Sequence, residues 1–147
     1  MNSIAKAFEA LFERQEWRFF KTDENNYAFG FNSEVNRFNL HATIEDQRHT
    51  LTIYSQVPFQ VPPGRMSEIA ELVSRANWNM ILGNFELDYD DGEIRFKISQ
   101  SFRFREPDPD EIMELLDCAL SMMQVYYTCF GDVIYGGQTV EEALSHM

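Results

Sequence analysis

The sequence has little positive charge. Its 147 residues include 24 acidic side chains but only 12 lysines and arginines, so the formal net charge is −12. Nucleic acids and anionic membranes both select proteins with basic surfaces, because their phosphate groups are negatively charged. We therefore expect neither a nucleic acid nor a membrane surface to be a partner of this protein.

Long apolar stretches are missing too. The chain contains no run of about 18 apolar residues, the length that crosses a bilayer. Glu9 and Glu13 interrupt the apolar residues near its start, whereas a secretory signal needs an unbroken apolar stretch. These two absences predict a protein that is neither exported nor inserted in a membrane.

Cysteine is scarce. Cys118 and Cys129 stand eleven residues apart on one predicted helix, a rise of about 16 Å that no disulfide can span. No histidine lies near either of them in the sequence, so we interpret both as core side chains and not as nucleophiles. Two free thiols fit a reducing compartment, and we predict that the protein is cytoplasmic.

Motifs that carry chemistry are also lacking. The chain has no cysteine and histidine spacing typical of a zinc site, no phosphate-binding glycine loop and no nucleophile elbow. The acidic segment 88–93 differs from a calcium-binding loop, because Gly92 takes the fifth position of a loop that starts at Asp88, not the sixth. We predict no catalytic residue, no cofactor and no metal site.

Apolar residues, in contrast, are plentiful. They make up 44% of the chain, and aromatic residues make up 14%. This composition and length fit a globular protein with a sizeable core. Because no linker, repeat or low-complexity segment divides the chain, we expect a single domain over residues 1–147.

Hydrophobic periodicity predicts one helix and three strands in the first part of the chain. Apolar residues at helical spacing favour a helix over residues 3–15. Strict alternation favours strands over 27–32, 38–44 and 51–57, and the short connections favour antiparallel hairpins. Residues 17–26 are predicted to connect the helix to the first strand.

Three helices are predicted in the second part. The first covers 65–82 and ends at Gly83, a common C-terminal cap. The second begins at Asp108, a good N-cap before Pro109, and ends at Gly131. A short final helix covers 140–146.

Between the first two of these helices, a hairpin is predicted from its turn. Alternating residues favour strands at 85–90 and 94–98, and Asp91-Gly92 is a preferred pair for a two-residue turn. Such a turn specifies the register. It pairs Tyr89 with Ile94, Leu87 with Phe96 and Phe85 with Ile98, and it brings Asp88 to Arg95 and Glu86 to Lys97.

The predicted element order is therefore α-β-β-β-α-β-β-α with a short C-terminal helix. Helices of this length can cover one face of a five-stranded antiparallel sheet. We predict a two-layer α+β fold.

The acidic residues are concentrated near the C-terminus. Residues 106–147 contain 9 acids and no lysine or arginine. One interpretation is solubility. The other is a negative face that steers a basic partner, and the sequence leaves both open.

Two surfaces are candidate interfaces with a second subunit or a protein partner. Trp78 and Leu82 lie opposite the apolar stripe of their predicted helix, so they need a cover, either the segment 133–135 or another chain. The sheet face turned away from the helices, which carries His41 and Tyr54, is the second candidate.

Several stretches of the chain resemble the YbjN-like proteins. They are Leu51–Ser55 followed by Val57-Pro58 and Val61-Pro62, then Arg75–Asn79, Leu82–Asp88 and Asp91–Phe96, and finally Gly136-Gly137. The resemblance implies a bacterial cytosolic protein with the type III secretion chaperone-like fold. Proteins of this family are described as sensory transduction regulators without assigned catalytic residues, and the better-known members of the fold are acidic dimers that hold extended segments of other proteins.

Three functions remain open from the sequence. The first is a non-enzymatic, homodimeric module that binds proteins in a regulatory or chaperone-like role. The second is an enzyme or small-molecule sensor with a pocket between helices and sheet, near His41 or Asn77, although Asn77 also fits a buried amide that satisfies backbone groups. The third is a purely structural role.

Overall fold

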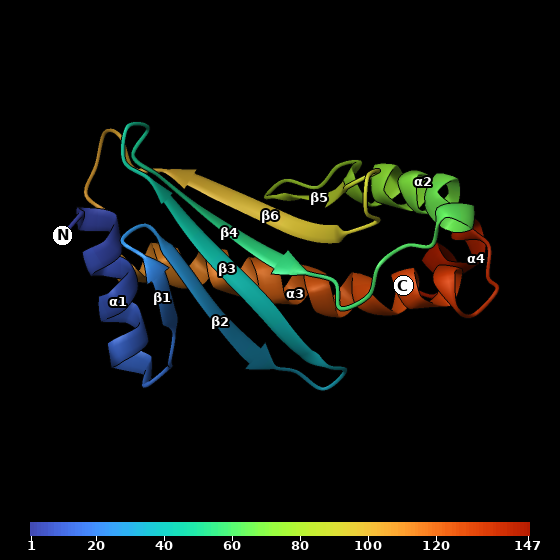
Figure 1. The fold of residues 1–147 in the computed structure, drawn as a ribbon, viewed down its shortest axis with the longest axis horizontal. Coiled ribbons are helices and arrows are strands. Elements are labelled where there is room, and N and C mark those ends of the chain that lie inside the picture. The colour runs from blue at the N-terminus through green and yellow to red at the C-terminus, as the bar shows by residue number, and fades with distance from the viewer.

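The computed structural model describes all 147 residues and has two layers, an antiparallel sheet and helices on one of its faces (Figure 1). The strands are β1 Phe20–Asp23, β2 Asn26–Asn32, β3 Arg37–Glu45, β4 Thr50–Gln56, β5 Asn84–Leu87 and β6 Ile94–Ser101. The helices are α1 Ser3–Gln15, α2 Met66–Asn77, α3 Pro109–Ile134 and α4 Val140–Ser145, with a 3-10 turn at Pro63–Arg65. The spatial strand order is β1-β2-β3-β4-β6-β5, and the predicted two-layer α+β class is confirmed.

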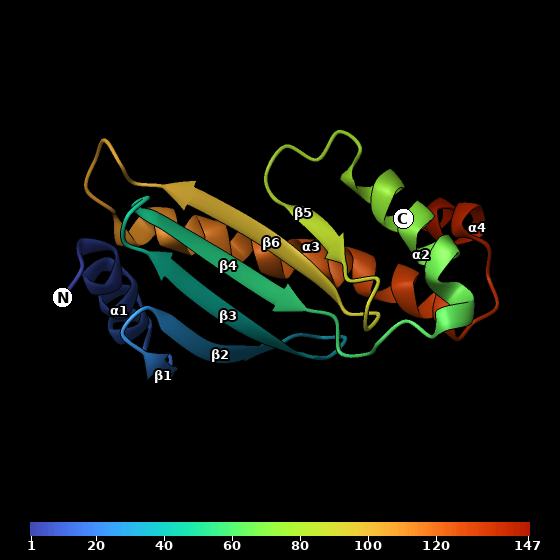
Figure 2. The same cartoon turned by 45° about the horizontal axis from the view of Figure 1, so that its top comes forward.

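Every second strand residue points into the helix layer, as the alternation predicts. Most inward residues of β2 to β6 are fully buried, and Phe31 and Leu87 are partly buried against the same core. The fully buried ones are Tyr27, Phe29, Phe38, Leu40, Ala42, Ile44, Leu51, Ile53, Ser55, Phe85, Ile94, Phe96 and Ile98. Helix α3 runs along this inner face, and α1 covers the end of the sheet near β1 and β2 (Figures 1 and 2). Helices α2 and α4 lie together at the opposite end.

Interlocking aromatic rings fill the core below α1. The ring of Phe8 stacks on Phe12 at 4.6 Å and lies 4.4 Å from the ring of Tyr27. Phe12 in turn makes edge contacts with Trp17 at 5.5 Å and Phe29 at 5.0 Å. Aromatic pairs at these separations add stability beyond the area that they bury.

The sheet has six strands, so the predicted count of five is wrong. The additional strand is β1, which pairs with β2 through Phe20 opposite Ala28 and Lys21 opposite Tyr27. All four residues of β1 are exposed, so no alternation of buried and exposed side chains marks it in the sequence. Backbone pairing at the sheet edge forms this strand.

Helix α2 ends at Asn77, five residues before the predicted end, and Gly83 is not its cap. Trp78 has extended backbone angles and Asn79 has a positive φ of 66°. The Asn77 side chain accepts a hydrogen bond from the Phe85 N–H at 2.8 Å and donates one to the Phe85 carbonyl at 3.1 Å. Phe85 is opposite Phe96, and the backbone N–H and carbonyl of Phe96 bond to β4. The backbone N–H and carbonyl of Phe85 therefore point away from β6, and Asn77 bonds to both of them at the outer edge of β5.

The hairpin register differs from the prediction by two residues. Phe85, Leu87, Phe96 and Ile98 face the core as predicted, but Tyr89, predicted on the same face, lies beyond the end of β5 and is 69% exposed. Leu87 is opposite Ile94 and Phe85 is opposite Phe96. The connection is longer than two residues and is closed by local hydrogen bonds, from the Asp88 N–H to the Glu93 carbonyl at 2.9 Å and from the Gly92 N–H to the Asp88 carbonyl at 2.8 Å. The Gly92 carbonyl also accepts a hydrogen bond from the Val61 N–H at 2.8 Å. This contact with the preceding loop holds Gly92 outside the ladder. The observed register is therefore held by the turn itself and by a contact with a distant segment.

This shift changes the predicted charge pairs. Glu86 pairs with Lys97 as predicted, with its Oε2 2.9 Å from Nζ. Arg95 also pairs with Glu86, at 2.8 Å, and the predicted pair between Asp88 and Arg95 does not form. Asp88 instead accepts a hydrogen bond from the Asp90 N–H within the turn.

Helix α3 is longer than predicted. It continues through Gly131 to Ile134 and is followed by the Gly136-Gly137 joint, where Gly137 has a φ of 67°. Its predicted N-cap is confirmed, because the Asp108 side chain accepts from the Asp110 N–H at 2.8 Å.

Both cysteines lie on α3, as predicted, and both thiols are free. Cys129 is buried in the core, whereas Cys118 is partly exposed.

Candidate functional site

The two pairs of predicted interface residues lie on separate surfaces. Trp78 and Leu82 belong to the connection between α2 and β5, and their exposed fractions are 79% and 49%. Val133 and Ile134, from the segment predicted to cover them, are buried in the core instead. The chain therefore leaves Trp78 uncovered.

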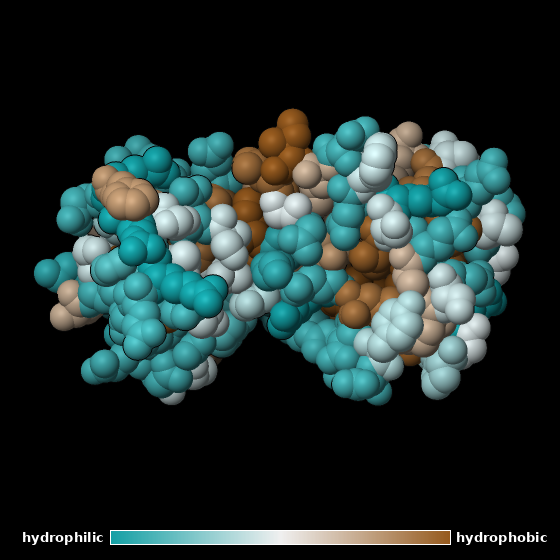
Figure 3. Space-filling view, turned by 90° about the horizontal axis from the view of Figure 1, so that it is seen from above, coloured by the Kyte–Doolittle hydropathy of each residue, from teal (hydrophilic) through white to brown (hydrophobic).

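Three residues of this connection form an apolar knob, Trp78, Ile81 and Leu82. Ile81 is 93% exposed. Figure 3 shows hydrophobic surface projecting where the α2–β5 connection lies. Because α2 stops at Asn77, these side chains stand on an irregular segment beside the sheet edge and not on a helix.

An apolar groove of about 400 Å³ separates the knob from α3. Besides the knob itself, its lining consists of Ala76, Asn79, Met80, Cys118, Met122 and Tyr126. No charged side chain is among them. Exposed apolar surface that is lined by tryptophan, tyrosine and methionine is typical of a protein interface.

Cys118 lies in this groove as a neutral thiol. Partial burial, together with the nearby Glu114 carboxylate, raises the pKa of Cys118 above its usual value. Its Sγ lies 3.8 Å from the Leu82 carbonyl oxygen. A reactive cysteine requires a lowered pKa, so this residue contributes apolar surface and not a nucleophile.

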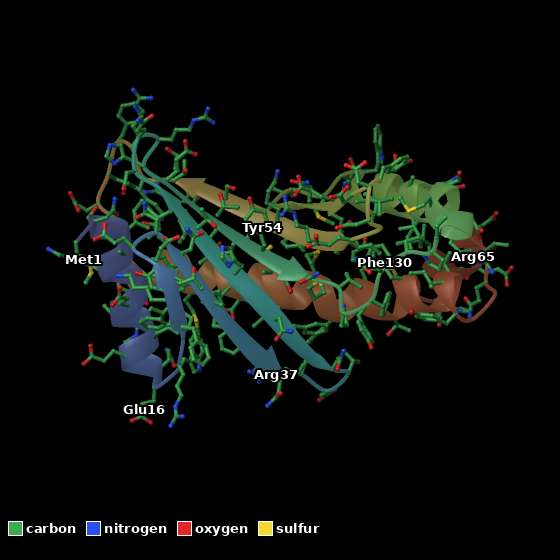
Figure 4. All side chains as sticks on the ribbon, viewed as in Figure 1. Met1, Glu16, Arg37, Tyr54, Arg65 and Phe130 are labelled. Carbon is green, nitrogen blue, oxygen red and sulfur yellow. The ribbon has the colours of Figure 1, made fainter.

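His41 and Tyr54 lie side by side on the outer sheet face, the face turned away from α3. They are direct partners across β3 and β4, with ring centroids 6.4 Å apart. The Arg95 guanidinium lies 4.2 Å above the Tyr54 ring, an attractive cation–π geometry. Figure 4 shows Tyr54 near the middle of the sheet.

A network of ion pairs continues across this face. Arg95 and Lys97 both donate to the carboxylate of Glu86. Partial burial alone would raise the pKa of Glu86, but the hydrogen bonds from Lys97 and Arg95 outweigh it and hold the pKa below its usual value. Glu86 is therefore negatively charged and already paired at neutral pH.

Two shallow depressions adjoin each other on the outer sheet face. The first, about 420 Å³, is lined by Asn39, Leu40, His41, Thr43, Tyr54, Gln56, Glu93 and Arg95. The second, about 650 Å³, is lined by Glu16, Trp17, Arg18, Phe20, Ala28, Phe29, Gly30, Phe31, Arg37, Asn39 and Leu40. Both include Asn39 and Leu40, so they adjoin each other, and we call the two together the outer trough.

The space between helices and sheet, where the sequence places a sensor pocket, is filled by the buried core. Asn77 bonds to backbone groups and lines none of the three cavities described above. The chain has no group of three or more histidine, cysteine or carboxylate side chains placed to hold a metal ion. None of the helices combines the length and the apolar character that a bilayer-spanning segment needs.

Comparison with known proteins adds the family. The family described as "Putative bacterial sensory transduction regulator", named YbjN, matches residues 5–132. The chain belongs to the YbjN family. No curated protein matches the sequence.

Solved structures similar to this YbjN-family chain share its fold. The chaperone–effector complex HopA1–SchA has a TM-score of 0.62 at 12% identity, over 85% of this chain and 93% of the other. E. coli YbjN, described as a candidate transcription regulator, has 0.61 at 11%, over 83% and 87%. The ExoT–SpcS complex from Pseudomonas aeruginosa has 0.55 at 14%, over 84% and 97%. The predicted type III secretion chaperone-like fold is thereby confirmed.

Sequence reasoning missed three residues that shape these surfaces. Ile81 was assigned to a helix, although Asn79 is a residue type that tolerates positive φ and so can end one. Arg18 and Arg37 line the outer trough of this YbjN-family protein. No local pattern identifies them, because the strand β1 that brings Arg18 beside the sheet has no periodic signal.

Proposed function

We propose that this YbjN-family protein is a non-enzymatic, homodimeric module that binds an extended segment of another protein, in a chaperone-like or regulatory role in the cytoplasm. The uncovered apolar knob and groove carry the proposal, because a soluble monomer rarely leaves such a surface free. Similar folds occur in the HopA1–SchA chaperone–effector complex and in the ExoT–SpcS complex. These complexes support the same kind of role here.

A second copy of the chain is the occupant that suits the apolar groove. The knob and the groove lie side by side, so a two-fold axis lets each copy insert its knob into the groove of the other. Each copy carries a net charge of −12, which favours an interface without charges. The groove lining is uncharged, and the nearby Glu71 is neutralised by Arg75 at 2.8 Å.

The outer sheet face then remains available for the partner. His41 and Tyr54 lie there, on the side opposite the acidic helix α3. The net charge of −12 opposes direct binding to DNA. A regulatory role would therefore act through a protein partner.

The molecular mass in solution tests the dimer. Sedimentation equilibrium should give twice the chain mass of 17.3 kDa for the wild type. The double variant Trp78→Ala and Ile81→Ser should sediment as a monomer, because it removes the knob. Phe104→Ser is the matched control, since Phe104 is 94% exposed but lies outside the groove lining.

Two outcomes would contradict the dimer. One is a monomeric wild type at micromolar concentration. The other is a dimer that Phe104→Ser disrupts as strongly as the double variant does. Circular dichroism of each variant should show an unchanged fold.

A small-molecule sensor is the second candidate function. The polar, concave part of the outer trough around His41 and Tyr54 favours it. A metabolite library screened by thermal shift would then give a hit that His41→Ala abolishes. If no compound shifts the melting temperature, this candidate fails.

A further inference from the structure

The charge on the outer sheet face differs from that of the rest of the molecule. The chain has twice as many acids as bases, yet three arginines and only two glutamates line the outer trough. These are Arg18, Arg37, Arg95, Glu16 and Glu93. This surface therefore lacks the negative excess that characterises the protein.

Two of these arginines have no carboxylate partner. Eight basic side chains form ion pairs, and they are Arg14, Lys21, Arg48, Arg65, Arg75, Arg95, Lys97 and Arg105. Arg18 and Arg37 are not among them, although both line the same depression. With two carboxylates for each base in the chain, unpaired guanidinium groups that share one trough indicate a site for an external anion.

The floor of the trough is shaped to hold one of these arginines across it. A Cβ atom at Gly30 would lie 2.8 Å from Nη2 of Arg37. The absence of a side chain at residue 30 therefore lets the Arg37 guanidinium extend from β3 over β2. Its Nη1 donates to the Asn32 side chain at 3.2 Å, and Figure 4 shows Arg37 at the end of the sheet.

The remaining lining suits a peptide. Trp17, Phe20 and Tyr54 supply aromatic surface, and Phe20 is largely exposed. Asn39 and Gln56 supply amides that can bond to a peptide backbone. The trough crosses from β1 to β6, about 19 Å at the usual strand spacing, which is the length of about six extended residues.

We infer that the outer trough binds an extended, acidic segment of a partner protein, with carboxylates on Arg18 and Arg37 and an apolar side chain between them. This inference rests on the proposed protein-binding function and specifies its partner. It also implies that the acidic residues of α3 serve solubility and not partner binding, because α3 lies in the opposite layer of the molecule. A basic partner steered by the C-terminal acids would bind there instead.

A displayed library of random twelve-residue peptides, selected on the immobilised protein, tests the inference. We expect selected peptides to be enriched in aspartate and glutamate. One selected peptide is then synthesised with its acids and with the corresponding amides. The amide version should bind the wild type about tenfold more weakly.

Variants of the protein locate the site. Arg37→Glu should weaken the acidic peptide about tenfold. Gly30→Ala should weaken it as well, because it displaces the Arg37 guanidinium without changing the charge of the protein. Arg103→Glu is the matched control, since Arg103 is another arginine without an ion pair and lies outside the trough, and it should change binding less than twofold.

Different failures have different meanings. If no peptide is selected, the proposed function fails and the inference fails with it. If the selected peptides are basic and Glu114→Gln with Asp117→Asn weakens them, protein binding stands and only the inference is overturned. Arg37-dependent binding of a single-stranded DNA probe would also overturn it, because the trough would then recognise phosphates.

Discussion

The two ends of the sheet are held by different kinds of contact. Below α1, interlocking aromatic rings such as Phe8, Phe12 and Tyr27 fill the core. At the β5 end, a few specific contacts decide the structure, namely the Asn77 amide on Phe85 and the passage of Val61 against Gly92. Buried rings also pack at the β5 end, where Phe85 lies 5.2 Å from Phe96 and 5.3 Å from Phe130, but the strand register and the end of α2 there depend in addition on these backbone contacts.

This comparison teaches which changes each end can accept. Many aromatic contacts contribute to stability below α1. Polar substitutions on the exposed surface of this end should therefore change the free energy of unfolding little. At the β5 end, single atoms determine the strand register and the end of α2. The following predictions test that difference in decreasing order of expected effect.

The largest effect should come from the aromatic end. Phe12→Ala removes a fully buried ring and should lower the free energy of unfolding by about 3–5 kcal/mol. Urea denaturation measures this loss. Phe104→Ala, at an exposed ring, should change it by less than about 0.5 kcal/mol, and equal losses in both variants would refute the packing argument.

Gly92→Ala should have the next largest effect on stability. Gly92 has a φ of 79°, and a Cβ there would lie 2.3 Å from the Val61 carbonyl oxygen. The clash and the unfavourable φ together should cost about 2–3 kcal/mol in urea denaturation. Gly64→Ala is the control, because no atom lies within 4 Å of its Cβ position. Wild-type stability of Gly92→Ala would contradict this account of the hairpin register.

Asn77→Ala should have a somewhat smaller effect. It leaves the Phe85 N–H and carbonyl without their partner and should cost about 2 kcal/mol. Asn77→Asp keeps an acceptor for the N–H but sets a carboxylate against the Phe85 carbonyl, so it should also destabilise the fold. Thermal unfolding of both variants checks this, and stability equal to the wild type would show that water replaces the amide.

The smallest effect concerns the ion pairs of Glu86. Its folded-state pKa is lowered, so the pairs with Arg95 and Lys97 stabilise the fold above the unfolded value of about 4.5. This contribution is lost as the pH falls through the folded pKa. Glu86→Gln should remove less than about 1 kcal/mol at pH 7 and nothing at pH 2, as measured by urea denaturation. Loss of the same size at both pH values would exclude the charge pairing as its cause.

Sequence reasoning predicted the helices and strands that have a periodic pattern of apolar residues. It missed the features that depend on a contact between distant parts of the chain. Helix α1 and strands β2, β3 and β4 follow from apolar periodicity almost residue by residue. The predicted hairpin register was wrong because the turn is longer than the Asp91-Gly92 pair indicates. Gly92 also bonds to Val61, about thirty residues upstream, a contact with no local pattern.

For the candidate site, helical periodicity identified Trp78 and Leu82 as exposed apolar residues, although both lie beyond the end of α2. It did not identify Arg18 and Arg37. Their lack of a carboxylate partner is a property of the folded molecule, because it depends on which acids lie within reach. Charge counts along a chain contain no such information.

The side-chain amide of Asn77, which bonds to the backbone of strand β5, also limits how copies of this protein can assemble. A sheet grows into a fibre only if one edge of each copy accepts the opposite edge of the next. Since Asn77 occupies the backbone groups of Phe85, head-to-tail stacking is opposed at β5. If β1 of one copy pairs with β1 of a second copy, the β5 strands are the sheet edges that remain. Growth is opposed at β5, so this assembly ends at two copies. One side chain thus acts against amyloid-like growth of the protein.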